Sequence, residues 1–156
     1  MKKSISPEQQ LKAFIDKFEP KLQRLIRAVR KSLRRRFPTA LELVYDNYNF
    51  FVIGFGPTER PSDCIVSIAA AANGVGICFT WGAKLPDPAG ILQGSGKQTR
   101  FLHLASADVL AEPAVQTLLT LAAERSKAPF PPDGKGKLII RSISAKQRPR
   151  RKPTRG

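Results

Sequence analysis

The chain has 156 residues, which is enough for one domain with its own hydrophobic core. Its hydrophobic content of 42% and charged content of 25% are those of a soluble globular protein. Its longest apolar runs are far shorter than the ~20 residues that span a bilayer, so we expect no membrane partner. The sequence turns polar directly after Met1-Lys2-Lys3, and without a signal peptide the expected location is the cytoplasm.

The formal net charge of +15 is unevenly distributed along the chain. Residues 21–36 carry eight basic side chains and no acidic one, and the tail from Lys146 carries six basic side chains and no acidic one. Residues 40–134, by contrast, carry six basic side chains against nine acidic ones, a net charge of −3. The positive charge therefore belongs to one helix and one tail, which are the places to look for an anionic partner.

Two helices are predicted at the N-terminus. Ser6, followed by Pro7 and by Gln9, has the pattern of a capping box that starts the first helix. A second helix is predicted to start at Pro20, because proline is tolerated in a first turn, and to end at Phe37-Pro38. Its apolar residues recur at helical spacing and leave a basic face toward water, which carries Arg24, Arg27, Lys31, Arg34 and Arg35.

The middle of the chain predicts strands. Asn73-Gly74 stands between two apolar runs and predicts a hairpin with a type I′ turn, which needs φ > 0 at both residues. Gly76 leaves a gap on one face of the outgoing strand, where a backbone or a ligand can approach. Strands are predicted over residues 41–48, 50–55, 63–72, 75–81 and 99–104, a helix from Pro113, and a late strand at a sheet edge over residues 138–143.

This order predicts an α+β fold, with an antiparallel sheet of five to six strands against which an N-terminal helix pair and a C-terminal helix pack. We assign residues 7–128 to the α+β domain and residues 129–144 to a linker and the late edge strand. Residues 145–156 are rich in Arg, Lys, Pro and Gln and have nothing to bury, so we predict a disordered basic tail.

A glycine-rich loop that includes Gly94 and Gly96 runs into Lys97 and Arg100. It does not match a phosphate-binding P-loop, which would need glycine at position 91 and Ser or Thr at position 98. Two interpretations of this loop remain. Either Lys97 and Arg100 bind an anionic group, or Arg100 pairs with a nearby carboxylate such as Asp87.

Neither catalysis nor a metal or cofactor is predicted. His103 has no acid or nucleophile placed beside it by sequence, and we interpret it as a partly exposed strand residue. Cys64 and Cys78 lie in predicted strands and are expected to be reduced, although a cross-strand disulfide is the alternative. No spacing of Cys, His and carboxylates typical of a metal site occurs.

The order of motifs resembles the YdhG-like domain family of small bacterial proteins. The resemblance rests on Leu85-Pro86-Asp87-Pro88, Gly94-Ser95-Gly96-Lys97 and Arg100, and on the Ala-rich helix after them. It implies an α+β fold with an antiparallel sheet. One branch of the family has been proposed to act as a frataxin-like iron chaperone, a role that relies on a row of carboxylates. Here the acidic residues are scattered: Glu42, Asp46, Asp63, Asp87 and Asp108.

Three functions follow as hypotheses. The first, implied chiefly by the resemblance, is a non-enzymatic binding or chaperone-type module that takes an anionic small ligand on the loop Gly94 to Arg100, with Trp81, Tyr45 and Tyr48 nearby. The second is a nucleic-acid-associated protein. The third is an iron-handling protein. The second hypothesis uses the basic helix face and the tail residues Arg148, Arg150, Arg151 and Lys152; its alternative is a solvated basic face without a partner.

Overall fold

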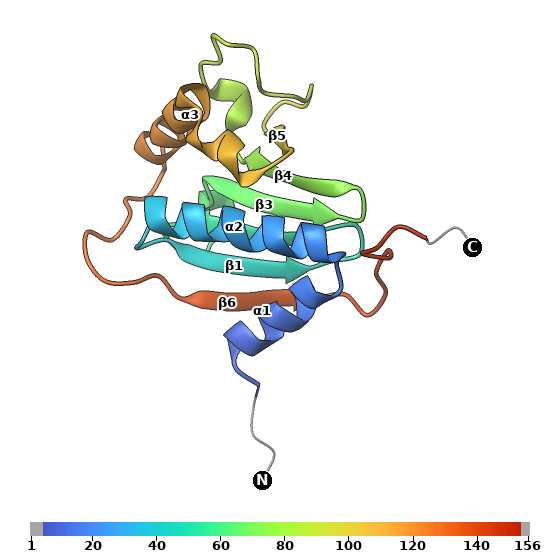
Figure 1. Ribbon diagram of the computed structural model, residues 1–156. Coiled ribbons are helices and arrows are strands. Elements are labelled where there is room, and N and C mark those ends of the chain that lie inside the picture. Colours follow the sequence, from blue (N-terminus) through green and yellow to red (C-terminus); the bar gives the residue numbers. More distant parts are fainter. Residues whose placement is uncertain (1–4, 154–156) are drawn as a thin grey trace.

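The computed structural model describes residues 5–153, which form a six-stranded sheet with three α-helices (Figure 1). The α+β prediction is therefore confirmed. The helices are α1 (Pro7–Asp16), α2 (Pro20–Arg36) and α3 (Pro113–Glu124). The strands are β1 (Leu41–Asp46), β2 (Phe51–Gly56), β3 (Val66–Ala71), β4 (Gly74–Phe79), β5 (Arg100–Leu104) and β6 (Leu138–Ile143).

Local sequence signals set the helix ends. The hydroxyl of Ser6 accepts a hydrogen bond from the Gln9 backbone N–H, and the Gln9 side chain accepts one from the Ser6 backbone N–H. This capping box satisfies donors that the first turn of α1 would otherwise leave unpaired. Pro20 occupies the first turn of α2, and that helix buries Ile26, Val29 and Leu33.

The sheet is mixed, not purely antiparallel. Its strand order is β5-β4-β3-β2-β1-β6, and every neighbouring pair is antiparallel except β1 and β6. After β5 the chain crosses to the opposite edge through α3 and a long connection, and β6 then runs in the same direction as β1. Such a crossover yields a parallel pair, so the prediction of an entirely antiparallel sheet was wrong at this edge, whereas the predicted edge position of residues 138–143 is confirmed.

The predicted β3–β4 hairpin is confirmed, but its turn differs from the expected one. Ala71 pairs with Gly74, so the loop residues are Ala72 and Asn73. Among residues 5–153 no residue other than glycine has a positive φ, and Gly74 has a φ of 148°. A side chain at Gly74 would also meet the ring of His103, 2.8 Å from its Cε1. A type I′ turn needs residues with positive φ inside the two-residue loop, whereas here glycine is needed at Gly74, the residue directly after the loop.

One hydrophobic core lies between the helices and one face of the sheet. Alternate residues of the strands, such as Ile53, Ile68 and Ile77, are fully buried in the same cluster as residues of all three helices. Figure 1 shows α2 lying along the sheet, α1 toward the β6 edge and α3 toward the β5 edge. The three helices thus cover different parts of the sheet, and the expected grouping into an N-terminal pair and a C-terminal helix describes this arrangement only loosely.

Residues 145–153 of the tail fold back on the body of the protein, contrary to the expectation of disorder, whereas residues 154–156 lie outside the described residues. Arg150 is only 4% exposed, and its guanidinium donates to the Asp46 carboxylate at 3.0 Å and to the Asn47 carbonyl. The Lys17 ammonium reaches the same carboxylate at 2.7 Å. A buried carboxylate on β1 supplies the partner that composition alone did not reveal, because Asp46 lies more than a hundred residues earlier in the chain.

We predict that Arg150→Met lowers the free energy of unfolding by about 2 kcal/mol, because a charge-assisted hydrogen bond to a buried carboxylate is lost. The retained contact between Lys17 and Asp46 keeps the cost below that of a fully orphaned charge. The measurement is urea denaturation of the full chain. Arg151→Met is the control, because Arg151 is exposed and donates only to backbone carbonyls, and we expect less than about 0.5 kcal/mol for it. Equal losses in the two variants would contradict the assignment of Arg150 as the buried anchor of the tail.

The same cluster predicts a pH dependence. Burial raises the pKa of the Asp46 carboxyl, but hydrogen bonds led by that from Lys17 outweigh burial and hold the pKa below the ordinary value of 3.8. A depressed folded-state pKa contributes stability that is present above 3.8 and is lost as the pH falls through the folded-state pKa. The difference in unfolding free energy between the native chain and Asp46→Asn should therefore be constant near neutral pH and should shrink below about pH 4. A difference that grows on acidification would contradict this.

Candidate anion-binding site

The glycine-rich loop and the segment before it use Arg100 and Asp87 in local hydrogen bonds. The Arg100 guanidinium donates to the backbone carbonyls of Gly96 and Thr99. Asp87 does not pair with Arg100 but accepts from the backbone N–H groups of Ile91 and Leu92 at 3.0 and 2.9 Å. Lys97, Gly94 and Gly96 are exposed. The loop is therefore fixed by local hydrogen bonds, and Arg100 is already engaged.

The three aromatic residues assigned to that loop do not line a common hollow with it. Trp81 follows β4, and its indole N–H donates to the Ser62 carbonyl. Tyr45 lies on β1 with a buried hydroxyl, which has no hydrogen-bond partner among the described residues. Tyr48 lies in the β1–β2 turn, where the Arg148 guanidinium stacks over its ring at 5.7 Å. The structure thus does not bring the predicted loop site together.

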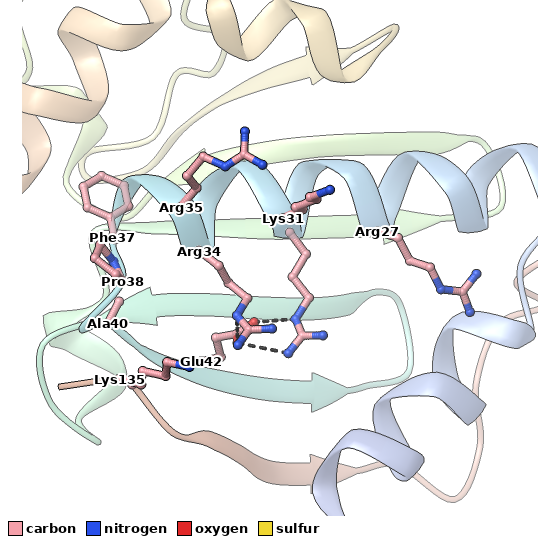
Figure 2. A pocket seen from close by; sticks show the side chains of 11 residues that line it. Arg27, Lys31, Arg34, Arg35, Phe37, Pro38, Ala40, Glu42 and Lys135 are labelled. Carbon is pink, nitrogen blue, oxygen red and sulfur yellow. Dashed lines mark hydrogen bonds and ion pairs between the residues drawn. The ribbon is translucent and has the colours of Figure 1, made fainter.

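The basic face of α2 instead lines a groove of about 390 Å³ (Figure 2). Four of the five predicted helix residues line it, and Arg24 is exposed on the same helix without lining it. The tail residues Arg148, Arg151 and Lys152 line a different hollow beside Tyr48, and Arg150 is buried. The cations of the groove are Arg27, Arg30, Lys31, Arg34, Arg35 and Lys135.

Two segments supply the cations of the groove. Helical spacing places the cations of α2 along one side of it, and the segment leading into β6 supplies Lys135 on the other. Gly136 allows this segment to approach closely: its N–H donates to the Pro38 carbonyl at 3.1 Å, and a Cβ there would collide with the Ala40 carbonyl oxygen. Lys135 is therefore held beside the groove by a backbone contact that only glycine permits.

A single carboxylate lines the groove, and arginines of α2 already pair with it. Glu42 is 4% exposed and accepts two hydrogen bonds from Arg30, at 2.7 and 3.0 Å. Arg34 approaches the same carboxylate at 3.4 Å. Burial lowers the pKa of Arg30, but its hydrogen bonds to Glu42 and Glu8 outweigh burial and raise the pKa above the ordinary value. Arg30 is thus a permanent, structurally engaged cation.

The other cations of the groove are less engaged. Figure 2 shows Arg34 pointing to Glu42, whereas Lys31 and Arg35 point away from that carboxylate. Among residues 5–153, Lys31, Arg35 and Lys135 form no ion pair. Arg27 pairs with Asp16, a contact in which both side chains are 43% exposed and which is therefore weak. The groove carries more positive charge than its own carboxylate neutralises.

Sequence reasoning found the helix face but missed Arg30, Glu42 and Lys135. Arg30 lies between the apolar stripe and the exposed face, so helical spacing alone does not assign it to the groove. Lys135 is distant in sequence, and only the parallel pairing of β6 with β1 brings it near α2. The one available signal was the Gly134-Lys135-Gly136 run, whose glycines permit a close backbone approach.

Within residues 5–153 the possible metal ligands do not gather at one place. No group of three or more His, Cys, Asp or Glu side chains within residues 5–153 could hold a metal ion. Cys64 and Cys78 are free thiols, and burial raises the pKa of Cys64 to about 11, which keeps it protonated at neutral pH. His103 is exposed on β5. Iron handling stays a prediction from the resemblance.

Comparisons of the chain with protein-family models, with curated proteins and with solved structures found no match. The resemblance to the YdhG-like family therefore stays a prediction. Within residues 5–153, none of the helices has the length and apolar character needed to cross a membrane.

We predict that Glu42→Gln lowers the free energy of unfolding by about 2–3 kcal/mol, because Arg30 loses a buried charged acceptor. Glu8→Gln is the matched control: it accepts from the same guanidinium but is 58% exposed, and we expect about 0.5 kcal/mol or less after solvent screening. Thermal or urea unfolding measures both. An effect of Glu8→Gln as large as that of Glu42→Gln would contradict the assignment of Glu42 as the buried anchor of the groove.

Proposed function

We propose that the protein is a non-enzymatic binding module that holds nucleic acid by its phosphate backbone in the groove beside α2. The observation that carries this proposal is the charge balance of the groove, in which six cations face one carboxylate that already accepts hydrogen bonds. Placing phosphates beside Lys31, Arg35 and Lys135 supplies anions that the described residues do not provide.

The layout of the cations favours a polyanion over a single small anion. Along the groove, from Arg27 to Arg35, the helix rises by about 12 Å at 1.5 Å per residue. One strand of B-DNA presents a phosphate about every 3.4 Å along its axis, so several phosphates lie within that length. A row of cations on one helix, with Lys135 added from a second element, matches a chain of charges better than it matches one compact anion.

The contacts are expected to be independent of base sequence. The aromatic ring of the groove, Phe37, is only 7% exposed and stacks on Phe130 at 5.8 Å between ring centroids. It is therefore committed to packing and offers no face on which a base could stack. Arginine and lysine contacts to phosphates position a duplex without discriminating between base pairs.

This proposal moves the candidate surface from the glycine-rich loop to α2. The loop remains exposed, but Arg100 is hydrogen-bonded within it, so Lys97 is its remaining cation. The tail contributes less than its composition suggests, because Arg150 holds Asp46 and Arg148 stacks on Tyr48. As part of the same proposal, we place the protein in the cytoplasm and expect it to catalyse no reaction.

The test is binding of a fluorescent DNA duplex by the full chain, measured by anisotropy over a range of salt concentrations. We predict that the triple variant Lys31→Gln, Arg35→Gln, Lys135→Gln binds at least about tenfold more weakly at low salt. We also predict that the slope of log K against log salt concentration falls in magnitude by about 3, because three phosphate contacts are removed.

The control variant Arg60→Gln, Lys97→Gln, Lys146→Gln removes the same charge from exposed positions outside the groove. It should retain the slope of the native chain, apart from a small loss from the lower net charge. Equal losses in both triple variants would show that overall charge, and not the groove, drives binding. No binding by the native chain at low salt would also refute the proposal.

A further inference from the structure

A second cavity, of about 220 Å³, lies between the end of α3 and the segment that follows β4. It is separate from the α2 groove and shares no lining residue with it. Its volume is below the roughly 300–1,000 Å³ of sites for drug-sized molecules, so it fits a smaller ligand. A cavity of this size can hold a ligand whose apolar part is about one ring in size.

The floor of the cavity is apolar. Ile65 is 3% exposed, Phe79 is fully buried and Ala122 is 8% exposed, and all three belong to the main hydrophobic core. Leu85 packs against the same core and also lines the cavity. Because these residues are fixed by core packing, the floor does not have to rearrange to accept an apolar group.

Trp81 forms a wall whose position is fixed by two contacts. Its indole N–H donates to the Ser62 carbonyl at 3.1 Å, and the Lys127 ammonium lies over its ring, 4.2 Å from the centroid. A fixed indole beside an apolar floor is a surface on which another ring can pack in an offset or edge-to-face arrangement. Sequence analysis assigned Trp81 to ligand binding, but beside a different set of residues.

The charged groups of the cavity are mostly cationic. Lys84, Arg125 and Lys127 line it, and Asp63 is its one carboxylate. Asp63 is 9% exposed and accepts a hydrogen bond from the Thr58 hydroxyl at 2.6 Å. None of the three cations forms an ion pair within residues 5–153.

Arg125 is anchored at this cavity, because one guanidinium nitrogen donates to the Lys84 carbonyl. This contact joins the end of α3 to the segment after β4 and uses only one of the donors of the guanidinium. The remaining donors, together with the two lysines, provide the charge that an anionic head group would need.

We propose that this cavity binds a small carboxylate whose apolar body is about one ring in size. The apolar body packs on the floor and against Trp81, and the carboxylate meets Lys84, Arg125 and Lys127. Such a division between an apolar body and a few placed polar groups is the usual arrangement of small-molecule sites. The inference does not depend on nucleic-acid binding, since none of its residues lines the α2 groove.

The chain contains one Trp residue, so its fluorescence reports on this cavity alone. Titrations of the full chain with benzoate, benzamide and acetate separate the two parts of the proposal, and calorimetry checks the fluorescence result. We expect saturable binding of benzoate, with benzamide at least about tenfold weaker because it lacks the charge. Acetate, which lacks the apolar body, should also bind at least about tenfold more weakly. Equal affinities for benzoate and benzamide, or no saturable change with benzoate, would overturn the proposal.

A variant pair then locates the site. Lys84→Gln with Lys127→Gln should weaken benzoate binding about tenfold and should weaken benzamide binding less, because only the loss of the Lys127 contact with Trp81 affects both ligands. Lys97→Gln with Lys146→Gln removes the same charge away from the cavity and should bind benzoate as the native chain does. All four lysines are exposed, so these substitutions should leave folding intact, which thermal unfolding verifies. An equal loss in the control pair would overturn the assignment of the cavity.

Discussion

Two buried carboxylates on β1 organise the charged side chains of this protein. Glu42 and Asp46 lie four residues apart, so the pleat turns both to the same side of the strand, and each is at most 4% exposed. Glu42 holds Arg30 and Arg34 of α2, whereas Asp46 holds Lys17 after α1 and Arg150 of the tail. A buried charge must be paired, so one strand fixes both N-terminal helices and the tail.

This pairing separates the cations into two groups. Those that meet Glu42 or Asp46 are part of the structure, and their removal should affect stability first. Among the groove cations that meet neither carboxylate, Lys31, Arg35 and Lys135 form no ion pair within residues 5–153, and Arg27 has only its weak contact with Asp16. A strongly basic composition therefore does not translate into a uniformly basic surface, and the groove beside α2 is where six cations line one concavity.

Much of the fold could be predicted because its signals are local. Ser6 and Gln9 mark the start of α1, and the Asn73-Gly74 region marks the β3–β4 hairpin. The parallel pairing of β6, the docking of Arg150 on Asp46 and the arrival of Lys135 beside α2 involve partners about a hundred residues apart. Neither hydrophobic periodicity nor a turn motif indicates such contacts. Composition accordingly suggested a free tail, and proximity in sequence suggested a site at the glycine-rich loop.

Lysine footprinting of the full chain, with and without a DNA duplex at low salt, tests the central claim most directly. Acetylation measured by mass spectrometry reports each lysine separately, so a contact is located without any substitution. The account predicts that the duplex protects Lys31 and Lys135 and leaves Lys97 and Lys146 as reactive as in the free protein. Protection confined to Lys146 and Lys152, or equal protection of every lysine, would contradict a binding groove beside α2.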